Sequence, residues 1–199
     1  MNLFHEVDDF LTEEELEIVD NNIMSTDFPW YYHQDSTSTL FPFFSHVIYS
    51  RNTTSEDDDY KVLSNSAMSH FMGPIVNRYC NTYLNKPVEK IYRSCLNLSF
   101  GWNVPYTHME PHVDHKFNHY NLLIYLNTVN QGGETLIFDK YHTGEMNTCF
   151  TVNEYDKVKP IGKISAKKAK AVCFDGKLYH SVNNFPTNER IIVLVTTFK

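Results

Sequence analysis

Hydrophobic positions near the N-terminus recur with the period of an α-helix. Apolar residues stand three or four positions apart from Leu16 to Ile23, which gives one continuous apolar face. Thr12 precedes this segment and Glu15 follows it by three positions, which is the pattern of a capping box. We therefore predict a helix over about residues 13–25.

A second helical pattern covers residues 67–83, where apolar residues recur in pairs every four positions. Gly73 and Pro74 interrupt the pattern. Either one helix kinks there, or a second helix begins with Pro74 at its first position. Pro87 ends the helical region, and we interpret its apolar stripe as core packing.

The remaining chain changes to β-prone runs separated by turn residues. The predicted strands are Phe4–Phe10, Phe41–Tyr49, Ile91–Phe100, Asn121–Leu126, Thr135–Phe138, Ala171–Phe174 and Arg190–Phe198. The order of elements predicts a mainly β fold, in which N-terminal helices support an antiparallel double sheet of jelly-roll type. A length of 199 residues suits one domain over 1–199. We expect a helical support region over 1–87 and the jelly-roll core over 88–199.

The charge and composition of the chain limit the classes of partner that we expect. The net charge of −7 provides no basic surface, so nucleic acid is not expected as a partner. No apolar run approaches the roughly eighteen residues of a membrane span. We interpret the lysines at 167–170 as a solvated strand edge rather than a binding patch, and the acidic range Asn52–Asp59 as an exposed loop.

The four cysteines are widely spaced and form no C-x-x-C pair. This spacing argues against a zinc knuckle or a redox motif. The N-terminal residues lack a basic segment followed by an apolar run, so we expect a reducing, cytoplasmic location with free thiols.

The strongest chemical signal is His112 and Asp114, two metal-ligand residues separated by one position. Residues i and i+2 of a strand point to the same face, so these two side chains could bind one ion together. His180 could supply a third ligand from a distant strand. Two histidines and one carboxylate form a facial triad that leaves open positions on iron.

The order of these residues and their neighbours resembles the 2-oxoglutarate/Fe(II)-dependent oxygenase superfamily, in particular its prolyl-4-hydroxylase-like branch. The matching motifs are His112-Val113-Asp114, Gly133-Glu134-Thr135, Phe174-Asp175-Gly176, His180, and Arg190 ten positions later. The likeness runs over about 88–199. It implies a double-stranded β-helix (jelly-roll) core that uses Fe(II), 2-oxoglutarate and O2, with ascorbate as a candidate reductant.

The resemblance also assigns roles to single residues. It implies that the catalytic iron ligands are His112, Asp114 and His180. Arg190 would pair with the distal carboxylate of 2-oxoglutarate, because a guanidinium fork matches a carboxylate. Tyr125 matches a tyrosine that contacts the same carboxylate in related hydroxylases, and Thr135 would add a hydroxyl. The chain departs from the family at Phe100-Gly101-Trp102, where a tyrosine is common.

Several of these residues have a plainer interpretation. Tyr125 could be a core tyrosine. His108, His115 and His119 are expected to be loop residues, or to shape the surroundings of the ligands. Glu110 and Arg93 could face the substrate or sit in ordinary ion pairs. Iron halogenases of this superfamily lack the carboxylate ligand, so Asp114 favours oxygen transfer.

The implied activity is hydroxylation of an unactivated C–H bond in a prolyl, peptidyl or amino-acid-like substrate, with release of succinate and CO2. One alternative is nucleobase oxidation, against which the acidic balance argues. Another is a non-catalytic jelly-roll module that senses a metal or a ligand. Trp30, Tyr31, Tyr32 and the insertion 140–163 either form the rim of the pocket or cover the core. Substrate identity and oligomeric state have no signal in the sequence.

Overall fold

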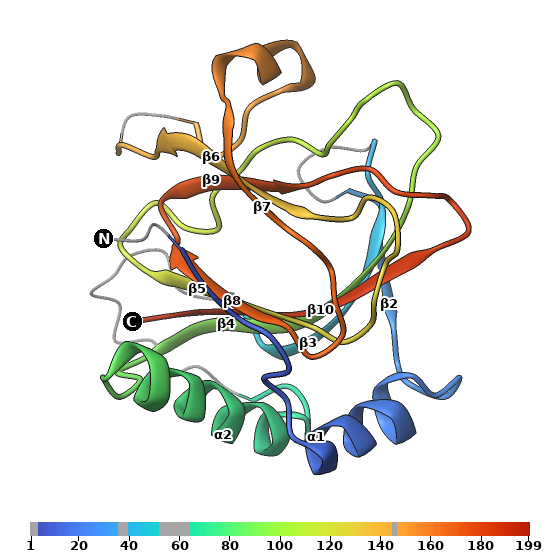
Figure 1. Cartoon of the computed structure of the whole chain (residues 1–199), viewed down its shortest axis with the longest axis vertical. Helices are drawn as coiled ribbons and strands as arrows, with labels where there is room; N and C mark the ends of the chain where they lie inside the picture. The colour runs from blue at the N-terminus through green and yellow to red at the C-terminus, as the bar shows by residue number, and fades with distance from the viewer. Residues whose placement is uncertain (1–3, 36–39, 52–63, 145–146) are drawn as a thin grey trace.

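The computed structural model describes residues 4–35, 40–51, 64–144 and 147–199. Within these ranges two antiparallel sheets lie face to face (Figure 1). The seven strands of the larger sheet are, in spatial order, β1 (Phe4–Val7), β8 (Ala171–Asp175), β5 (Tyr120–Tyr125), β10 (Arg190–Phe198), β4 (Ile91–Phe100), β3 (Phe43–Tyr49) and β2 (Tyr31–His33). The smaller sheet contains β7 (Pro160–Ile164), β6 (Thr135–Tyr141) and β9 (Leu178–Val182).

Two helices cover the outer face of the larger sheet (Figure 1). They are α1 (Glu13–Ile18) and α2 (Ser69–Tyr79), each continued by a π-helical segment, Val19–Ile23 and Cys80–Leu84. The predicted capping box is present: the Glu15 N–H donates to Thr12 Oγ1 at 3.2 Å, and the Thr12 N–H donates to Glu15 Oε2 at 2.9 Å. Pro74 lies inside α2, so of the two alternatives left open by the sequence, a second helix that begins at Pro74 does not occur.

Strand β10 runs through the middle of the larger sheet and separates two cores. Ile192 and Leu194 point toward the helices and pack in the same cluster as Ile75. Ile191 and Val195 point to the opposite face, into the space between the sheets. The alternation follows from the two-residue repeat of an extended strand.

Most predicted strands are confirmed, although their ends differ. The N-terminal strand stops at Val7 rather than Phe10, because the chain turns through Asp9, whose φ is +50°. The range 1–87 supplies helices and also three strands of the larger sheet. Strands β2, β7 and β9 were not among the predicted strands, because they are short and lack a clear alternation of apolar and polar residues.

Ion pairs attach the N-terminal segment to the edge of the larger sheet. Lys170 Nζ lies 2.9 Å from Glu6 Oε2, and Lys168 Nζ lies 2.7 Å from Asp20 Oδ1. Lys168 is exposed as expected, but Lys170 is buried, so the prediction of a fully solvated cluster is wrong for this residue. Its burial is compensated by the carboxylate partner.

All four cysteines carry free thiols, as predicted. No helix in the described part of the chain is long and apolar enough to cross a membrane. The acidic range Asn52–Asp59 lies outside the described residues.

The contact between α2 and the larger sheet predicts the effect of a cavity mutation. Ile75 is 1% exposed inside the core under the sheet. We expect Ile75→Ala to lower the free energy of unfolding by about 2–5 kcal/mol, because it removes buried methyl groups and leaves a void. Urea unfolding followed by circular dichroism measures this change.

Ile161→Ala is the matched control. Ile161 is 42% exposed on β7, so its truncation should change the free energy of unfolding by less than about 0.5 kcal/mol. Equal destabilisation by the two substitutions would contradict the packing of α2 described above.

Candidate metal and ligand site

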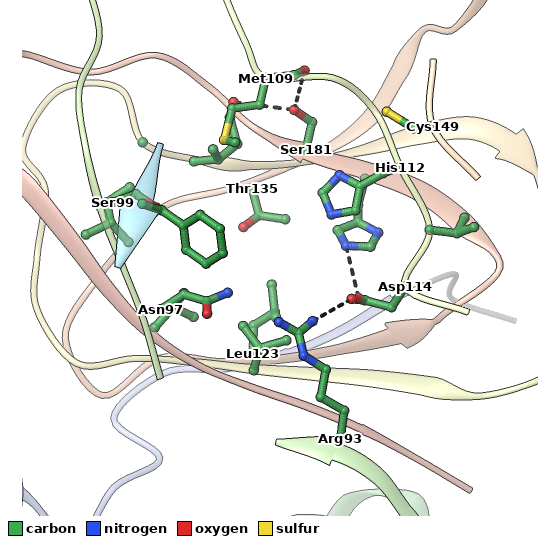
Figure 2. Close-up of a pocket in the computed structure, with 18 of the residues that line it drawn as sticks. Arg93, Asn97, Ser99, Met109, His112, Asp114, Leu123, Thr135, Cys149 and Ser181 are labelled. Atoms are coloured by element: carbon green, nitrogen blue, oxygen red, sulfur yellow. Dashed lines mark hydrogen bonds and ion pairs between the residues drawn. The ribbon is translucent and has the colours of Figure 1, made fainter. Parts of the chain in front are cut away.

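A cavity of about 460 Å³ lies between the two sheets. This volume suits a small ligand together with part of a second one. Its walls come from β4, β5 and β10 of the larger sheet, from β6 and β9 of the smaller sheet, and from the segment 109–114. Figure 2 shows this space with its lining side chains.

His112 and His180 are joined through their backbones on one wall of the cavity. The N–H of each residue donates to the carbonyl oxygen of the other, at 2.9 Å in both directions. This antiparallel bridge places the two imidazole rings side by side, with centroids 4.6 Å apart. Residues that are distant in the sequence therefore present their rings to one point.

We predicted a strand for the segment that carries His112 and Asp114, but the structure has no regular strand there. His112 forms isolated bridges with His180 and Cys149, and Asp114 lies in a bend. The chain is nonetheless extended here, and the Val113 N–H donates to Thr148 O at 2.8 Å. Val113 packs in a separate apolar cluster, and the two residues beside it line the cavity.

Both imidazole rings are oriented by backbone carbonyl groups. Nδ1 of His112 lies 3.0 Å from Glu110 O, and Nδ1 of His180 lies 3.3 Å from Leu178 O. A carbonyl oxygen only accepts, so Nδ1 of His112 carries a proton and its Nε2 is available to the site, whereas Nε2 of His180 faces Oδ2 of Asp114. Burial, assisted by the neighbouring His180, lowers the pKa of His112 to about 4. His112 is therefore neutral at pH 7, the form that binds a metal.

Asp114 is held by positive charges. Its Oδ1 accepts from Arg51 Nη2 at 2.6 Å and from Arg93 Nη1 at 2.9 Å, and its Oδ2 lies 3.5 Å from His180 Nε2. Burial favours the neutral acid, but the hydrogen bond from His180 and the two guanidinium groups outweigh burial and hold the pKa of Asp114 well below its usual range. The carboxylate is ionised throughout the physiological range.

The three predicted ligands thus share one wall, but they do not form a finished metal centre. Across the described residues, no group of three or more histidine, cysteine, aspartate or glutamate side chains is arranged to hold a metal ion. The donor types, two imidazoles and one carboxylate, fit Fe(II). Arg51 and Arg93 hold Oδ1 of Asp114, and Oδ2 faces His180, so Oδ2 is the oxygen placed to serve as a metal ligand.

The structure does not place Arg190 in the cavity. Its side chain is exposed, and it shares the helix-facing side of β10 with Ile192 and Leu194. The cavity side of the same strand carries Ile191 and Val193. Arg190 therefore does not line the cavity, because the strand repeat turns it to the other face, and its contact with a cosubstrate carboxylate stays a prediction.

Tyr125 and Thr135 do lie together in the cavity. The Tyr125 hydroxyl donates to Thr135 Oγ1 at 2.5 Å, and both residues are buried. Thr135 begins β6 directly after Gly132 and Gly133, whose φ angles are +76° and +72°. Only glycine takes such angles readily, so this turn sets the position of Thr135.

The remaining predicted residues divide between the cavity and its surroundings. Trp30, Tyr31 and Tyr32 do not line the cavity; Tyr31 and Tyr32 are 62% and 61% exposed on the edge strand β2. The insertion 140–163 contributes Thr148 and Cys149 to the lining.

The three flanking histidines lie outside the cavity lining. His115 and His119 are buried, and they hold the loop after Asp114 through Thr197 Oγ1 (2.8 Å) and Phe117 O (2.9 Å). His108 stacks on Tyr155 with ring centroids 4.2 Å apart.

Part of the wall formed by β4 was not predicted. Asn97 and Ser99 face the cavity beside Arg93, which was expected to face a substrate or to form an ion pair, and Arg51 approaches from the end of β3. Arg93 and Asn97 are four positions apart, so the predicted strand already places their side chains on the same face. The approach of Arg51 could not be predicted, because it depends on how β3 pairs with β4.

Comparison with known proteins gives a clear result for the fold. No protein-family model and no curated protein sequence matches the chain. An oxidoreductase of the 2OG-Fe(II) oxygenase family from Burkholderia pseudomallei superposes with a TM-score of 0.67 at 12% identity, over 99% of this chain and 85% of that chain. The chain has the fold of these oxygenases. The predicted jelly-roll core is confirmed.

Two further structures broaden the likeness. The prolyl hydroxylase of Trichoplax adhaerens, in complex with a peptide fragment of the oxygen degradation domain of hypoxia inducible factor, gives a TM-score of 0.59 at 15% identity, over 100% of this chain and 84% of that chain. The epimerase SnoN, in complex with Fe3+, alpha ketoglutarate and nogalamycin RO, gives 0.61 at 11% identity, over 98% and 78%. The same fold thus serves a peptide and a small molecule in different proteins.

The exposure of the cysteines predicts their reactivity. Cys149 is half-buried on the cavity wall, whereas Cys80, Cys95 and Cys173 are buried. Burial raises the pKa of Cys80 to about 11, and it also raises the pKa of the other two buried thiols. Because the thiolate is the reactive form, iodoacetamide at pH 8 should label Cys149 first.

Peptide mass spectrometry of the labelled protein measures the order of reaction. Labelling in denaturant is the control, in which all four cysteines should react at similar rates. Labelling of Cys80 as fast as Cys149 in the folded protein would contradict the burial described here.

Proposed function

We propose that this protein is a 2-oxoglutarate- and Fe(II)-dependent dioxygenase that hydroxylates an unactivated C–H bond. The observation that carries the proposal is the backbone bridge that places His112 beside His180, with Asp114 on the same wall of the cavity. Two imidazoles and a carboxylate inside this fold are the donors that an oxygen-activating iron requires.

In this proposal His112, Asp114 and His180 hold the iron. When bound, Fe(II) together with 2-oxoglutarate and O2 would supply the oxidising power for hydroxylation, with release of succinate and CO2, and ascorbate would serve as a reductant. The carbonyl partners of Nδ1 fix both imidazole rings before any ligand arrives.

The apolar and polar walls of the cavity have different roles in this proposal. Leu123, Val193 and Val195 line one part and keep water from the reacting atoms. Tyr125 and Thr135 present two hydroxyl groups in the same space and suit a polar group of the cosubstrate. The chain therefore offers its own means to orient a small acid and to shield the reaction.

We propose a prolyl, peptidyl or amino-acid-like substrate. The peptide complex of the Trichoplax prolyl hydroxylase is consistent with this class. The cavity itself is too small to enclose a long peptide, so a peptide would insert one side chain.

A second candidate function is a sensor module without catalysis. The pairing of Asp114 with Arg51 and Arg93 favours it, since these cations balance the charge of the carboxylate without a metal ion. Turnover decides between the two functions, because a sensor binds ligands but forms no succinate.

The first test is metal binding by the whole chain. We expect wild-type protein to bind Mn(II), a stand-in for Fe(II), and His180→Ala to bind it at least about 100-fold more weakly, because a direct ligand is lost. Isothermal titration calorimetry measures both affinities. His70→Ala is the control, since His70 is exposed on α2 and lies outside the cavity. Retention of full affinity by His180→Ala would contradict the ligand assignment.

The second test is turnover. Protein loaded with Fe(II) should convert 2-oxoglutarate to succinate in the presence of O2, and addition of a true substrate should increase the rate. Screening peptides and metabolites for the gain of one oxygen atom by mass spectrometry identifies the substrate. Metal binding without any succinate formation across this screen would favour the sensor instead.

A further inference from the structure

The floor of the cavity continues beyond the cavity to the edge strand β2. Asn97 lines the cavity from β4, on the side opposite His112 (Figure 2). It stands opposite Ser45 on β3, and Ser45 stands opposite Tyr31 on β2. Directly opposed residues of antiparallel strands point to the same face of a sheet. These three side chains therefore form a row that leads from the cavity to the outer edge of the larger sheet, where Figure 1 shows β2.

Two stacked rings run beside this row. Phe43 lines the cavity, and the ring of His33 stacks on it with centroids 4.8 Å apart and planes 19° apart. Nε2 of His33 lies 2.7 Å from Ser45 Oγ, so a hydrogen bond holds this ring in place. Tyr31, two positions before His33 and on the same face of β2, is 62% exposed. The inner face of the larger sheet is therefore covered at Phe43 and open to solvent at Tyr31.

We call this surface the β2 ledge. It consists of the residues of β2 and β3 that face inward, namely Tyr31, His33, Phe43, Ser45 and Val47. None of them is an acid, a lysine or an arginine. The ledge offers aromatic rings and small polar groups, which suit uncharged side chains and peptide groups better than the charged end of a small acid.

The backbone edge of β2 is available as well. Strand β2 ends the larger sheet, and no strand among the described residues pairs with its outer side. Its three residues include neither a formally charged side chain nor a proline. The other three sheet edges are protected: β1 carries Glu6, β7 carries Pro160 and Lys163, and β9 is bridged by His112. Charges and prolines prevent an edge from pairing with a further strand, so β2 is the edge best suited to accept one.

We propose that an extended, uncharged peptide segment adds a strand to β2, and that the same peptide crosses the β2 ledge and inserts one residue into the cavity. The proposal rests on the proposed function, because it states how the substrate of that site is held. The cavity of about 460 Å³ encloses a side chain but not a strand, so the rest of a peptide lies outside it. Backbone pairing supplies affinity, and Tyr31 contacts the segment that crosses the ledge.

Strand spacing sets the length that such a peptide needs. Three spacings separate β4 from a strand added beyond β2, and each spacing is about 4.8 Å, which gives about 14 Å. An extended residue spans about 3.3 Å. The residue that enters the cavity therefore stands about four or five positions from the segment that pairs with β2.

The experiment measures peptide binding to the full chain. The probes are a library of acetylated and amidated peptides of about fifteen residues, with a central proline and uncharged side chains elsewhere, a length that follows from the spacing above. Peptides retained by the immobilised protein are identified by mass spectrometry, synthesised with a fluorescent label and titrated by anisotropy. We expect the tripeptide cut from the centre of the best binder to bind at least about tenfold more weakly, because it fills the cavity without reaching β2.

Tyr31→Ala tests the ledge, and Tyr32→Ala is the matched control. The two neighbours are 62% and 61% exposed, but Tyr32 stands opposite Phe44 on the other face of the sheet. We expect Tyr31→Ala to weaken binding of the best peptide about fivefold, because an aromatic contact is lost, and Tyr32→Ala to change it less than about twofold. Neither residue lines the cavity, so Mn(II) affinity should be the same in both variants as in wild type.

Methylation of alternate backbone nitrogens tests the strand pairing. Successive N–H groups of a strand point to opposite sides, so only one alternate set in the peptide can donate to β2. Two versions of the best peptide are made, methylated at the odd or at the even positions on both sides of the proline. We expect one version to bind about tenfold more weakly and the other to bind about as well as the unmodified peptide. Equal affinities of the two versions would contradict strand addition.

The proposal fails if no peptide of the library binds wild type, or if Tyr31→Ala and Tyr32→Ala have equal effects. It also fails if wild type sediments as a dimer and Tyr31→Ala as a monomer, because β2 then pairs with a second copy of the chain. If wild type binds Mn(II) and forms succinate in these cases, the proposed function stands without this inference. Peptide binding by a chain that neither binds Mn(II) nor forms succinate would remove the proposed function and leave the peptide site.

Discussion

The backbone bridge between His112 and His180 is the contact on which the candidate site depends. Two hydrogen bonds of 2.9 Å join the segment after Met109 to β9, and they bring two imidazole rings within 4.6 Å without any direct bond between the side chains. A backbone contact is rigid and insensitive to protonation, so the ring positions do not depend on the ligand. The metal site is to this extent preorganised by strand pairing, and Arg51 and Arg93 hold Asp114 beside the two rings.

The two-residue repeat of a strand decides which side chains can reach this site. On β4 the repeat turns Arg93 and Asn97 into the cavity, and on β10 it turns Ile191 and Val193 inward. Arg190 is one position away from the inward set, and this single step places it on the helix side of the sheet. The cationic part of the cavity therefore lies on β4 and at the end of β3 instead of at the start of β10.

The sequence allowed the helices, most strands and the wall carrying His112, Asp114 and His180 to be predicted, because each depends on local pattern or on residue order. The predicted role of Arg190 came from its distance to His180, and such a count does not determine which face of β10 a residue occupies. Arg51 could not be predicted at all, since its approach to Asp114 depends on pairing between strands. Short strands such as β9 were missed because burial on both faces removes the alternation that marks a strand.

The pairing of Asp114 with two guanidinium groups has a consequence for how the site would assemble. A carboxylate buried without a partner would protonate, and a neutral acid is a poor metal ligand. Arg51 and Arg93 prevent this by holding the pKa of Asp114 well below its usual range. Their contacts are to Oδ1, so they keep the carboxylate ionised while Oδ2 remains directed at His180. The two arginines therefore set the charge and orientation of this carboxylate, as the backbone bridge sets the positions of the two imidazole rings.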